Sequence, residues 1–259
     1  MAPIIHPLPV LGDNYSYLIL DDSDTRTAIV VDPGDGAAIH KRLLSLGCTI
    51  DAILVTHHHL DHVAGIEELC SGGAVNVVAH ASEMNRVPKA NTAVHDGERI
   101  TVGTFTIHVL HVPGHTRGHV AYLLGENLFT GDALFLGGCG RLFEGTAAEM
   151  FHSLNSRIRV LPDTVLIYPG HEYTVRTRSF SLSVDTGNVL LSQKLEEARS
   201  LQAHNMPTVP GDLHTEKLSN VFLRCDAPEV VAQVQKHHPG LPDDPISIFR
   251  QLRTMMDTF

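Results

Sequence analysis

The run THHHLDH at residues 56–62 constrains this chain more than any other feature of its sequence. It directly follows the apolar run AILV, which is typical of a short buried strand. Side chains of an extended segment alternate between two sides, so His57 and His59 are expected to point the same way. Asp61 and His62 then open a helix and can aim at a second point nearby. Four metal-binding side chains within six residues therefore indicate a site that can hold two centres.

Three further polar residues stand next to glycines at the ends of strand-like runs: His115, Asp132 and His171. Glycine lets the backbone approach closely, and α/β scaffolds assemble their sites at the ends of several strands. A competing interpretation is a polar loop whose histidines cap strand and helix ends. That interpretation explains a single His-x-His pair, but it does not explain four ligands at this spacing together with three distant partners.

Strand and helix patterns alternate along the first two thirds of the chain. Strands are expected at 14–20, 26–31, 52–55, 76–79, 105–112, 119–124, 127–132 and 165–168, with a helix at 147–160. From about residue 175 the pattern is helical, with apolar residues at helical spacing over 189–204 and helix starts at Asp226-Ala-Pro228 and Asp244-Pro245. We expect an α/β domain over residues 1–174 and a helical domain over residues 175–259, and the family resemblance given below implies that the first is catalytic and the second binds the substrate.

The composition narrows the classes of partner. Apolar residues make up 43% of 259 residues, so a large core can be buried, while a net charge of −10 argues against nucleic acid or an anionic membrane. The start of the chain lacks a signal-peptide pattern, and no stretch approaches the roughly 18 apolar residues of a membrane span. Four dispersed cysteines without a CxxC pair suit a reducing compartment. We expect a cytoplasmic monomer that acts on a small molecule.

Residues 56–62 resemble the THxHxDH signature of the metallo-β-lactamase superfamily. The resemblance implies an αββα sandwich, here followed by an all-helical C-terminal domain, and two divalent metal ions. It assigns one ion to His57, His59 and His115 and the other to Asp61, His62 and His171, with Asp132 bridging both. Zinc is favoured, and iron or manganese also suits imidazole and carboxylate ligands. Asp61 and Asp132 are also the carboxylates expected to be catalytic, because they hold the two ions. Two ions about 3.5–4 Å apart lower the pKa of a water that they share.

Three more segments resemble glyoxalase II, the hydroxyacylglutathione hydrolase family of this superfamily: GCGRLFEGT at 138–146, GHEYT at 170–174 and NVFLR at 220–224. This likeness covers essentially the whole chain. It implies hydrolysis of S-D-lactoylglutathione, or of a related conjugate such as lactoyltrypanothione, to D-lactate and the free thiol by a metal-bound hydroxide. The leaving thiolate, whose thiol pKa is about 8.5, departs without a strong general acid.

The glyoxalase II likeness also implies the substrate contacts, which fall on Arg141, Phe143, Tyr173, Arg253 and Met256. Phe143 lacks the hydroxyl group of the usual tyrosine, and Met256 lacks the charge of the usual lysine. A role for Met256 in packing is therefore favoured over contact with a carboxylate. The lost cation leads to the hypothesis that the physiological thiol has fewer free carboxylates than glutathione, as trypanothione does.

Two other functions stay in view. A persulfide dioxygenase of the same superfamily, which uses one iron, resembles the histidine-rich loop but lacks the EGT element and the helical extension. A non-catalytic metal-binding protein would be expected to have lost ligands, whereas all seven ligand types are present. Glu144-Gly145-Thr146 and the region 175–259 favour the hydrolase.

Overall fold

The computed structural model describes residues 3–259, which form two compact units. The first, here called the sandwich unit, contains the chain up to His111 and residues 118–131 and 170–172. The second, here called the helical unit, contains residues 112–117, 132–169 and 173–259.

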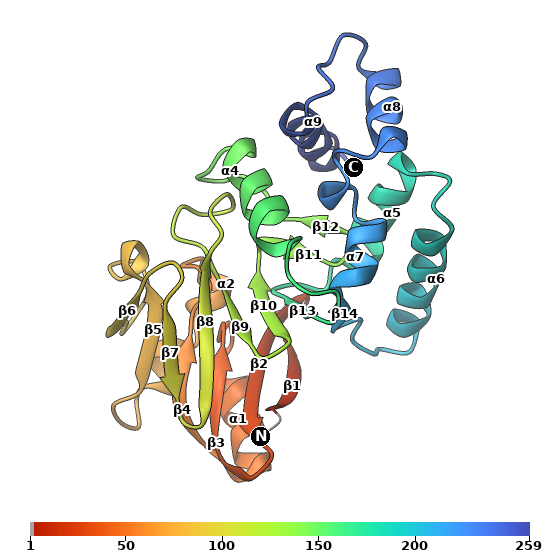
Figure 1. Cartoon of the computed structure of the whole chain (residues 1–259). Coiled ribbons are helices and arrows are strands. Elements are labelled where there is room, and N and C mark those ends of the chain that lie inside the picture. Colours follow the sequence, from red (N-terminus) through yellow and green to blue (C-terminus); the bar gives the residue numbers. More distant parts are fainter. Residues whose placement is uncertain (1–2) are drawn as a thin grey trace. The chain divides into compact units, whose positions relative to one another are not determined.

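The sandwich unit is built on a six-stranded sheet (Figure 1). Its strands lie in chain order: β1 (Pro3–Val10), β2 (Asn14–Asp21), β3 (Asp24–Val31), β4 (Thr49–Leu54), β5 (Asn76–His80) and β6 (Thr92–Val94). The first three strands are antiparallel, and β3 to β6 are parallel. Every residue of β2 is buried, as expected for a strand whose two faces are both covered.

Four antiparallel strands of a second sheet cover one face of the first: β7 (Arg99–Val102), β8 (Phe105–His111), β9 (Val120–Leu124) and β10 (Asn127–Gly131). The Tyr122 hydroxyl of β9 donates a hydrogen bond to the Val55 carbonyl oxygen at 3.0 Å, just after β4. The rings of Tyr17 and Phe129 meet edge to face with centroids 5.4 Å apart. The two sheets therefore share one apolar core.

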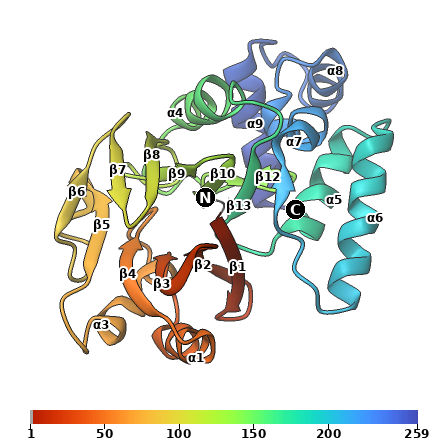
Figure 2. The same ribbon diagram turned by 60° about the horizontal axis from the view of Figure 1, so that its bottom comes forward.

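Short helices cover the other face of the six-stranded sheet (Figure 2). They are α1 (Gly36–Leu46), α2 (Leu60–Val63) and α3 (Ile66–Leu69), and a 3-10 turn, η1 (Ala81–Glu83), follows β5. The Asp35 side chain caps α1 by accepting from the Ala38 amide, and Gly47 ends it in the left-handed region. Ile39 and Leu43 of α1 belong with Ile53 of β4 to one cluster of buried apolar residues.

The helical unit contains two pairs of very short strands: β11 (Leu134–Phe135) with β12 (Gly138–Cys139), and β13 (Leu166–Pro169) with β14 (Gly211–Asp212). Its helices are α4 (Ala147–His152), α5 (Thr174–Val184), α6 (Val189–Ala203), α7 (Leu213–Ser219), α8 (Pro228–His237) and α9 (Pro245–Asp257). The helix expected at 147–160 is α4 continued by a π-helical turn, η2 (Ser153–Ile158), and η3 (Val221–Leu223) is a 3-10 turn.

The helix starts expected in the last third of the chain are confirmed. Asp244 caps α9 by accepting from the Ser247 amide at 3.0 Å, with Pro245 at the first helical position. Pro228 takes the first helical position of α8, where the N-cap residue Ala227 makes no side-chain hydrogen bond. Phe180, Phe222 and Phe249 form the aromatic centre of this unit. Throughout the described chain, each helix falls short of the length and apolar character that a membrane crossing needs.

Two neighbouring leucines of α1 test the core of the sandwich unit. Leu43 is 3% exposed and Leu44 is 68% exposed. Leu43→Ala should lower the free energy of unfolding by about 2–5 kcal/mol, because it removes buried methyl groups and leaves a cavity. Leu44→Ala makes the same chemical change at the surface and should alter stability by about 0.5 kcal/mol or less. Urea unfolding followed by circular dichroism measures both, and equal losses would contradict the packing described.

Candidate metal centre

The loop after β4 brings two imidazoles together in the sandwich unit. The Nε2 atom of His57 lies 3.1 Å from the Nδ1 atom of His59, and His57 is fully buried. Thr56 Oγ1 contacts the other ring nitrogen of His57 at 3.1 Å, which fixes the orientation of that ring. Adjacent ligand atoms of a tetrahedral zinc site, with bonds of 2.0–2.1 Å, lie about 3.4 Å apart. The His57–His59 spacing therefore suits two ligands of one ion.

A second group of ligands gathers where α2 begins. The Asp61 Oδ2 atom lies 3.5 Å from His62 Nε2 and 3.3 Å from His171 Nε2. One ligand atom from each of these three residues lies within 4.8 Å of the others, as ligands of a single ion would. The segment that carries His171 is anchored to β2, because the Tyr15 amide donates to the Gly170 carbonyl oxygen at 2.8 Å. Imidazole and carboxylate at this spacing fit a divalent metal ion.

Two carboxylates behind these histidines were not recognised from the sequence as part of the site. Asp32 Oδ2 lies 3.1 Å from His62 Nδ1, and Asp32 also accepts from the amide and the hydroxyl of Thr56 at 2.8 and 2.6 Å. Asp13 Oδ1 lies 3.1 Å from His171 Nδ1. A carboxylate on the far nitrogen fixes the tautomer of a metal-binding histidine and raises its basicity.

The position of Asp32 offered a signal that could have revealed it. Asp32 follows the last residue of β3, Val31, which pairs in parallel with Leu54 of β4. The ends of these two strands therefore lie side by side, and the residue after β3 falls next to the histidine-rich loop. Residues 32–36 (DPGDG) have the composition of a turn, and the parallel pairing of β3 with β4 is not visible in that local pattern.

Two other histidines of the sandwich unit pack around this loop. His58 Nδ1 contacts a carboxylate oxygen of Glu83, whose other oxygen accepts from the Gly118 amide at 2.9 Å. The His119 ring stacks on the His57 ring, with centroids 4.8 Å apart and planes 19° from parallel. The stacking contact restricts the His57 ring, which carries a predicted ligand nitrogen, and the contact with Glu83 holds His58 between the two ligands His57 and His59.

The helical unit contributes its own pair of predicted ligands. His115 Nε2 lies 3.4 Å from Asp132 Oδ2, and both residues are buried. The other ring nitrogen of His115 contacts the Arg141 carbonyl oxygen at 2.8 Å. Gly140 lies so close to Asp132 that a Cβ atom there would come within 1.9 Å of the Asp132 carbonyl oxygen. Only glycine fits this position, which explains one glycine of the GCG motif.

Side chains of the helical unit hold the loop of residues 135–140, here called the GCG loop. Each of the six successive carbonyl oxygens from Phe135 to Gly140 accepts a hydrogen bond from a side chain. Asn220 donates to Phe135 and Gly138, Thr177 to Leu136, Ser181 to Gly137, and Arg253 to Cys139 and Gly140. The Gly137 amide donates to the buried Glu216 carboxylate at 2.7 Å. The loop that joins Asp132 to Arg141 is therefore fixed by α5, α7, α9 and Asn220.

The predicted substrate contacts lie in different places within the helical unit. Arg141, Phe143 and Arg253 line a cavity of about 310 Å³, here called the α9 hollow, with Arg250, Thr254 and Asp257. The Tyr173 ring instead packs edge-on against Phe135, with centroids 5.2 Å apart. Met256 is 6% exposed, and its methyl group lies next to Gly138.

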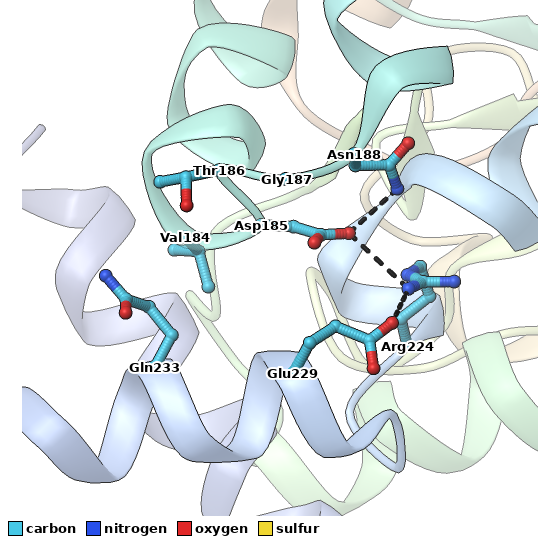
Figure 3. A pocket seen from close by; sticks show the side chains of 8 residues that line it. All are labelled: Val184, Asp185, Thr186, Gly187, Asn188, Arg224, Glu229 and Gln233. Atoms are coloured by element: carbon cyan, nitrogen blue, oxygen red, sulfur yellow. Dashed lines mark hydrogen bonds and ion pairs between the residues drawn. The ribbon is translucent and has the colours of Figure 1, made fainter.

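A second cavity of the helical unit, of about 420 Å³, is lined by polar residues that neutralise one another (Figure 3). Arg224, from the NVFLR segment, forms ion pairs with Asp185 and Glu229. Asn188 donates to the Asp185 carboxylate at 2.8 Å. Because one guanidinium is balanced by two carboxylates, this cavity does not attract an anionic substrate.

Comparison with known proteins agrees with this geometry. Residues 10–171 match the family model of the metallo-beta-lactamase superfamily, and residues 172–259 match that of the hydroxyacylglutathione hydrolase C-terminus. Hydroxyacylglutathione hydrolases of Cyanothece sp. and Photobacterium profundum are 43% and 41% identical to this chain, and each alignment covers 98% of this chain and 99% of the relative.

The crystal structure of ETHE1 from Myxococcus xanthus is 27% identical and has a TM-score of 0.67, covering 98% of this chain and 99% of that one. The predicted fold class, a metallo-β-lactamase fold with a C-terminal helical domain, is thereby confirmed. The chain belongs to the hydroxyacylglutathione hydrolases, the glyoxalase II family of the metallo-β-lactamase superfamily.

Proposed function

We propose that this chain hydrolyses the thioester S-D-lactoylglutathione to D-lactate and glutathione. One observation carries the proposal: Asp61, His62 and His171 present ligand atoms 3.3–3.5 Å apart, in a chain that matches hydroxyacylglutathione hydrolases along nearly its whole length. A hydrolase of this kind needs no serine or cysteine nucleophile, because water activated by metal ions supplies the attacking oxygen.

We infer that seven residues hold two divalent metal ions. One ion would bind His57, His59 and His115, the other would bind Asp61, His62 and His171, and Asp132 would bridge both, with Asp61 and Asp132 as the catalytic carboxylates. Support comes from each unit by itself, since the spacing of its own ligand atoms suits metal binding. When bound, such ions polarise the thioester carbonyl and lower the pKa of a shared water towards neutrality. Zinc is our first candidate, and iron or manganese suits the same ligands.

Other residues of the sandwich unit orient the ligand side chains. Asp32 and Asp13 hold His62 and His171 through their Nδ1 atoms, so the Nε2 atoms of both rings stay directed at Asp61. Asn14 donates to Asp61 Oδ2 at 2.9 Å and restrains that carboxylate. The glutathione thiolate can leave without a strong acid, because its conjugate thiol has a pKa of only about 8.5.

A persulfide dioxygenase is the enzymatic alternative. Such an enzyme needs one iron held by two histidines and a carboxylate, whereas the sandwich unit alone offers the His57–His59 pair and the Asp61–His62–His171 group. The relatives that match along the full chain are named as hydrolases. These observations favour the hydrolase.

The wider setting follows from the same proposal. We propose residues 1–174 as the catalytic domain and 175–259 as the substrate-binding domain, a division close to the boundary between the two family models. All four cysteines are free thiols, which supports a reducing compartment such as the cytoplasm. We expect a monomer whose partner is a small thioester rather than nucleic acid or a membrane.

Removal of one ligand tests the metal assignment. Purified wild-type protein should contain close to two metal ions per chain and should hydrolyse S-D-lactoylglutathione. In a separate assay with glutathione persulfide, it should consume no oxygen. His59→Ala and Asp132→Ala should each lose metal, and kcat/KM should fall on the order of 100-fold or more, because several kcal/mol of charge stabilisation disappear. Elemental analysis and a thioesterase assay measure these changes.

The matched control is His40→Ala, which removes an exposed imidazole from α1 of the same unit. Its metal content and turnover should equal those of the wild type. Unchanged turnover in either ligand variant, or oxygen uptake in the wild type, would refute the assignment.

Substitution of Cys139 tests whether the reaction proceeds without an acyl-enzyme intermediate. This thiol lies in the GCG loop, but burial raises its pKa to about 11, so it stays protonated at neutral pH and is a poor nucleophile. Cys139→Ala should therefore keep kcat within about threefold of the wild type. A burst of thiol release from the wild type that disappears in this variant would show instead that Cys139 is acylated.

Comparison of lactoylglutathione with lactoyltrypanothione tests which thiol carries the acyl group of the substrate. Met256 is buried beside Gly138, which supports the packing role expected for it. We expect lactoylglutathione to be hydrolysed with a kcat/KM at least equal to that of lactoyltrypanothione, because the α9 hollow keeps an arginine excess. A clear preference for lactoyltrypanothione, measured by release of free thiol, would reverse this choice.

A further inference from the structure

His171 stands on a very short segment of the sandwich unit. Of residues 132–259, only Gly170–Glu172 belong to this unit, and the residues on either side, 132–169 and 173–259, belong to the helical unit. Three residues cannot close an α-helical hydrogen bond among themselves, because that bond joins residues four positions apart. The orientation of His171 therefore depends on the contacts that its two neighbours make with the rest of the sandwich unit.

Backbone hydrogen bonds attach both neighbours of His171 to the start of β2. The Gly170 carbonyl oxygen accepts from the Tyr15 amide at 2.8 Å. The Glu172 amide donates to the Asp13 carbonyl oxygen at 2.7 Å. The segment is therefore placed by residues 13–15, which precede it by more than 150 positions in the chain.

A side-chain hydrogen bond reinforces these backbone contacts. The Tyr15 hydroxyl donates to the Glu172 carboxylate at 2.5 Å. Tyr15 is 2% exposed, and its ring packs near that of Tyr17 with centroids 6.0 Å apart, so the hydroxyl has a fixed place. Tyr15 thus contacts both neighbours of His171, Gly170 through its amide and Glu172 through its hydroxyl.

The other restraint on His171 is more exposed. Asp13 Oδ1 lies 3.1 Å from His171 Nδ1, but the Asp13 side chain is 54% exposed. Charged contacts at the surface contribute little, whereas a buried hydroxyl that donates to a carboxylate makes a strong hydrogen bond. The bond between Tyr15 and Glu172 is therefore the firmer restraint on this segment.

The position of His171 has to be set closely. Its Nε2 atom lies 3.3 Å from Asp61 Oδ2, and both are predicted ligands of one ion. Bond lengths in metal sites vary by only about 0.2 Å around their usual values. Because the ring is carried by a three-residue segment, a small shift of Glu172 would move Nε2 by more than this tolerance.

We propose that Tyr15 is a positioning residue that keeps the metal ligand His171 in place by holding Glu172. This inference rests on the proposed two-metal centre and extends it to a side chain that binds no metal itself. Loss of the hydroxyl should leave Asp61 and His62 where they are and weaken binding of the ion that His171 shares with them. Partners behind metal ligands typically change metal affinity 10–100-fold.

The test measures metal content and turnover of the whole enzyme over a range of chelator concentrations. Tyr15→Phe keeps the ring and removes the hydroxyl. The dissociation constant of one ion should rise on the order of 10–100-fold, while that of the other changes less than about twofold. Turnover of S-D-lactoylglutathione should fall as that ion is lost and should recover when metal is added in excess.

Substitutions of Glu172 test whether Tyr15 acts through this residue. Glu172→Ala should weaken the same ion as Tyr15→Phe does. Glu172→Gln keeps an oxygen that can accept from the hydroxyl, so it should retain most of the affinity. The double variant of Tyr15→Phe with Glu172→Ala should bind metal no more weakly than either single variant, because both changes remove the same hydrogen bond.

Tyr17→Phe is the matched control. It makes the same chemical change two residues further along β2, where the ring packs against Phe129, and both dissociation constants should stay within about twofold of the wild type. Equal weakening of both ions in Tyr15→Phe would show a general effect on the fold and would overturn the inference. Unchanged constants in Tyr15→Phe, or additive losses in the double variant, would overturn it as well.

These outcomes are separate from the proposed function. A wild type that binds two ions and hydrolyses S-D-lactoylglutathione would still uphold that function if Tyr15→Phe behaved like the wild type. A wild type that binds no metal and leaves the thioester intact would refute the function itself.

Discussion

The helical unit depends on how the carbonyl groups of the GCG loop are satisfied. A buried backbone oxygen without a partner costs free energy comparable to a lost hydrogen bond, and only one ladder pair, Phe135 with Gly138, lies within residues 135–140. Side chains of later helices supply the missing donors, from Asn220 through to Arg253. The position of Asp132 before the loop and of Arg141 after it therefore follows from a network of neutral and charged donors.

In the sandwich unit, the main constraint is the orientation of the imidazole rings, whose ligand nitrogens must lie close together. Each imidazole is fixed from behind: Thr56 contacts His57, Asp32 contacts His62 and Asp13 contacts His171. Because Asp32 is bonded to the Thr56 backbone as well, the end of β3 and the loop after β4 form one rigid piece. Such rigidity keeps ligand atoms close even though their lone pairs repel one another.

Much of this architecture could be predicted from the sequence, because its signals are local. The ligand loop is contiguous, and the starts of α8 and α9 are marked by prolines at the first helical position, with the Asp244 cap just before α9. The features that the sequence did not reveal depend on contacts between distant segments. Asp32 gains its role from the parallel pairing of β3 with β4, and the burial of Arg253 depends on carbonyl groups more than a hundred positions earlier. No local pattern contains that information.

The hydrogen bonds from Arg253 to the GCG loop also set the order in which parts of the chain can fold during synthesis. Arg253 follows Cys139 by 114 positions, so a ribosome adding about 5–20 residues per second produces the loop roughly 6–23 s before its last hydrogen-bond donor. The strands of the sandwich unit up to β10 are already made by then. A nascent chain can thus fold most of its β-structure before α9 has been synthesised, and the GCG loop gains the Arg253 donor only after that.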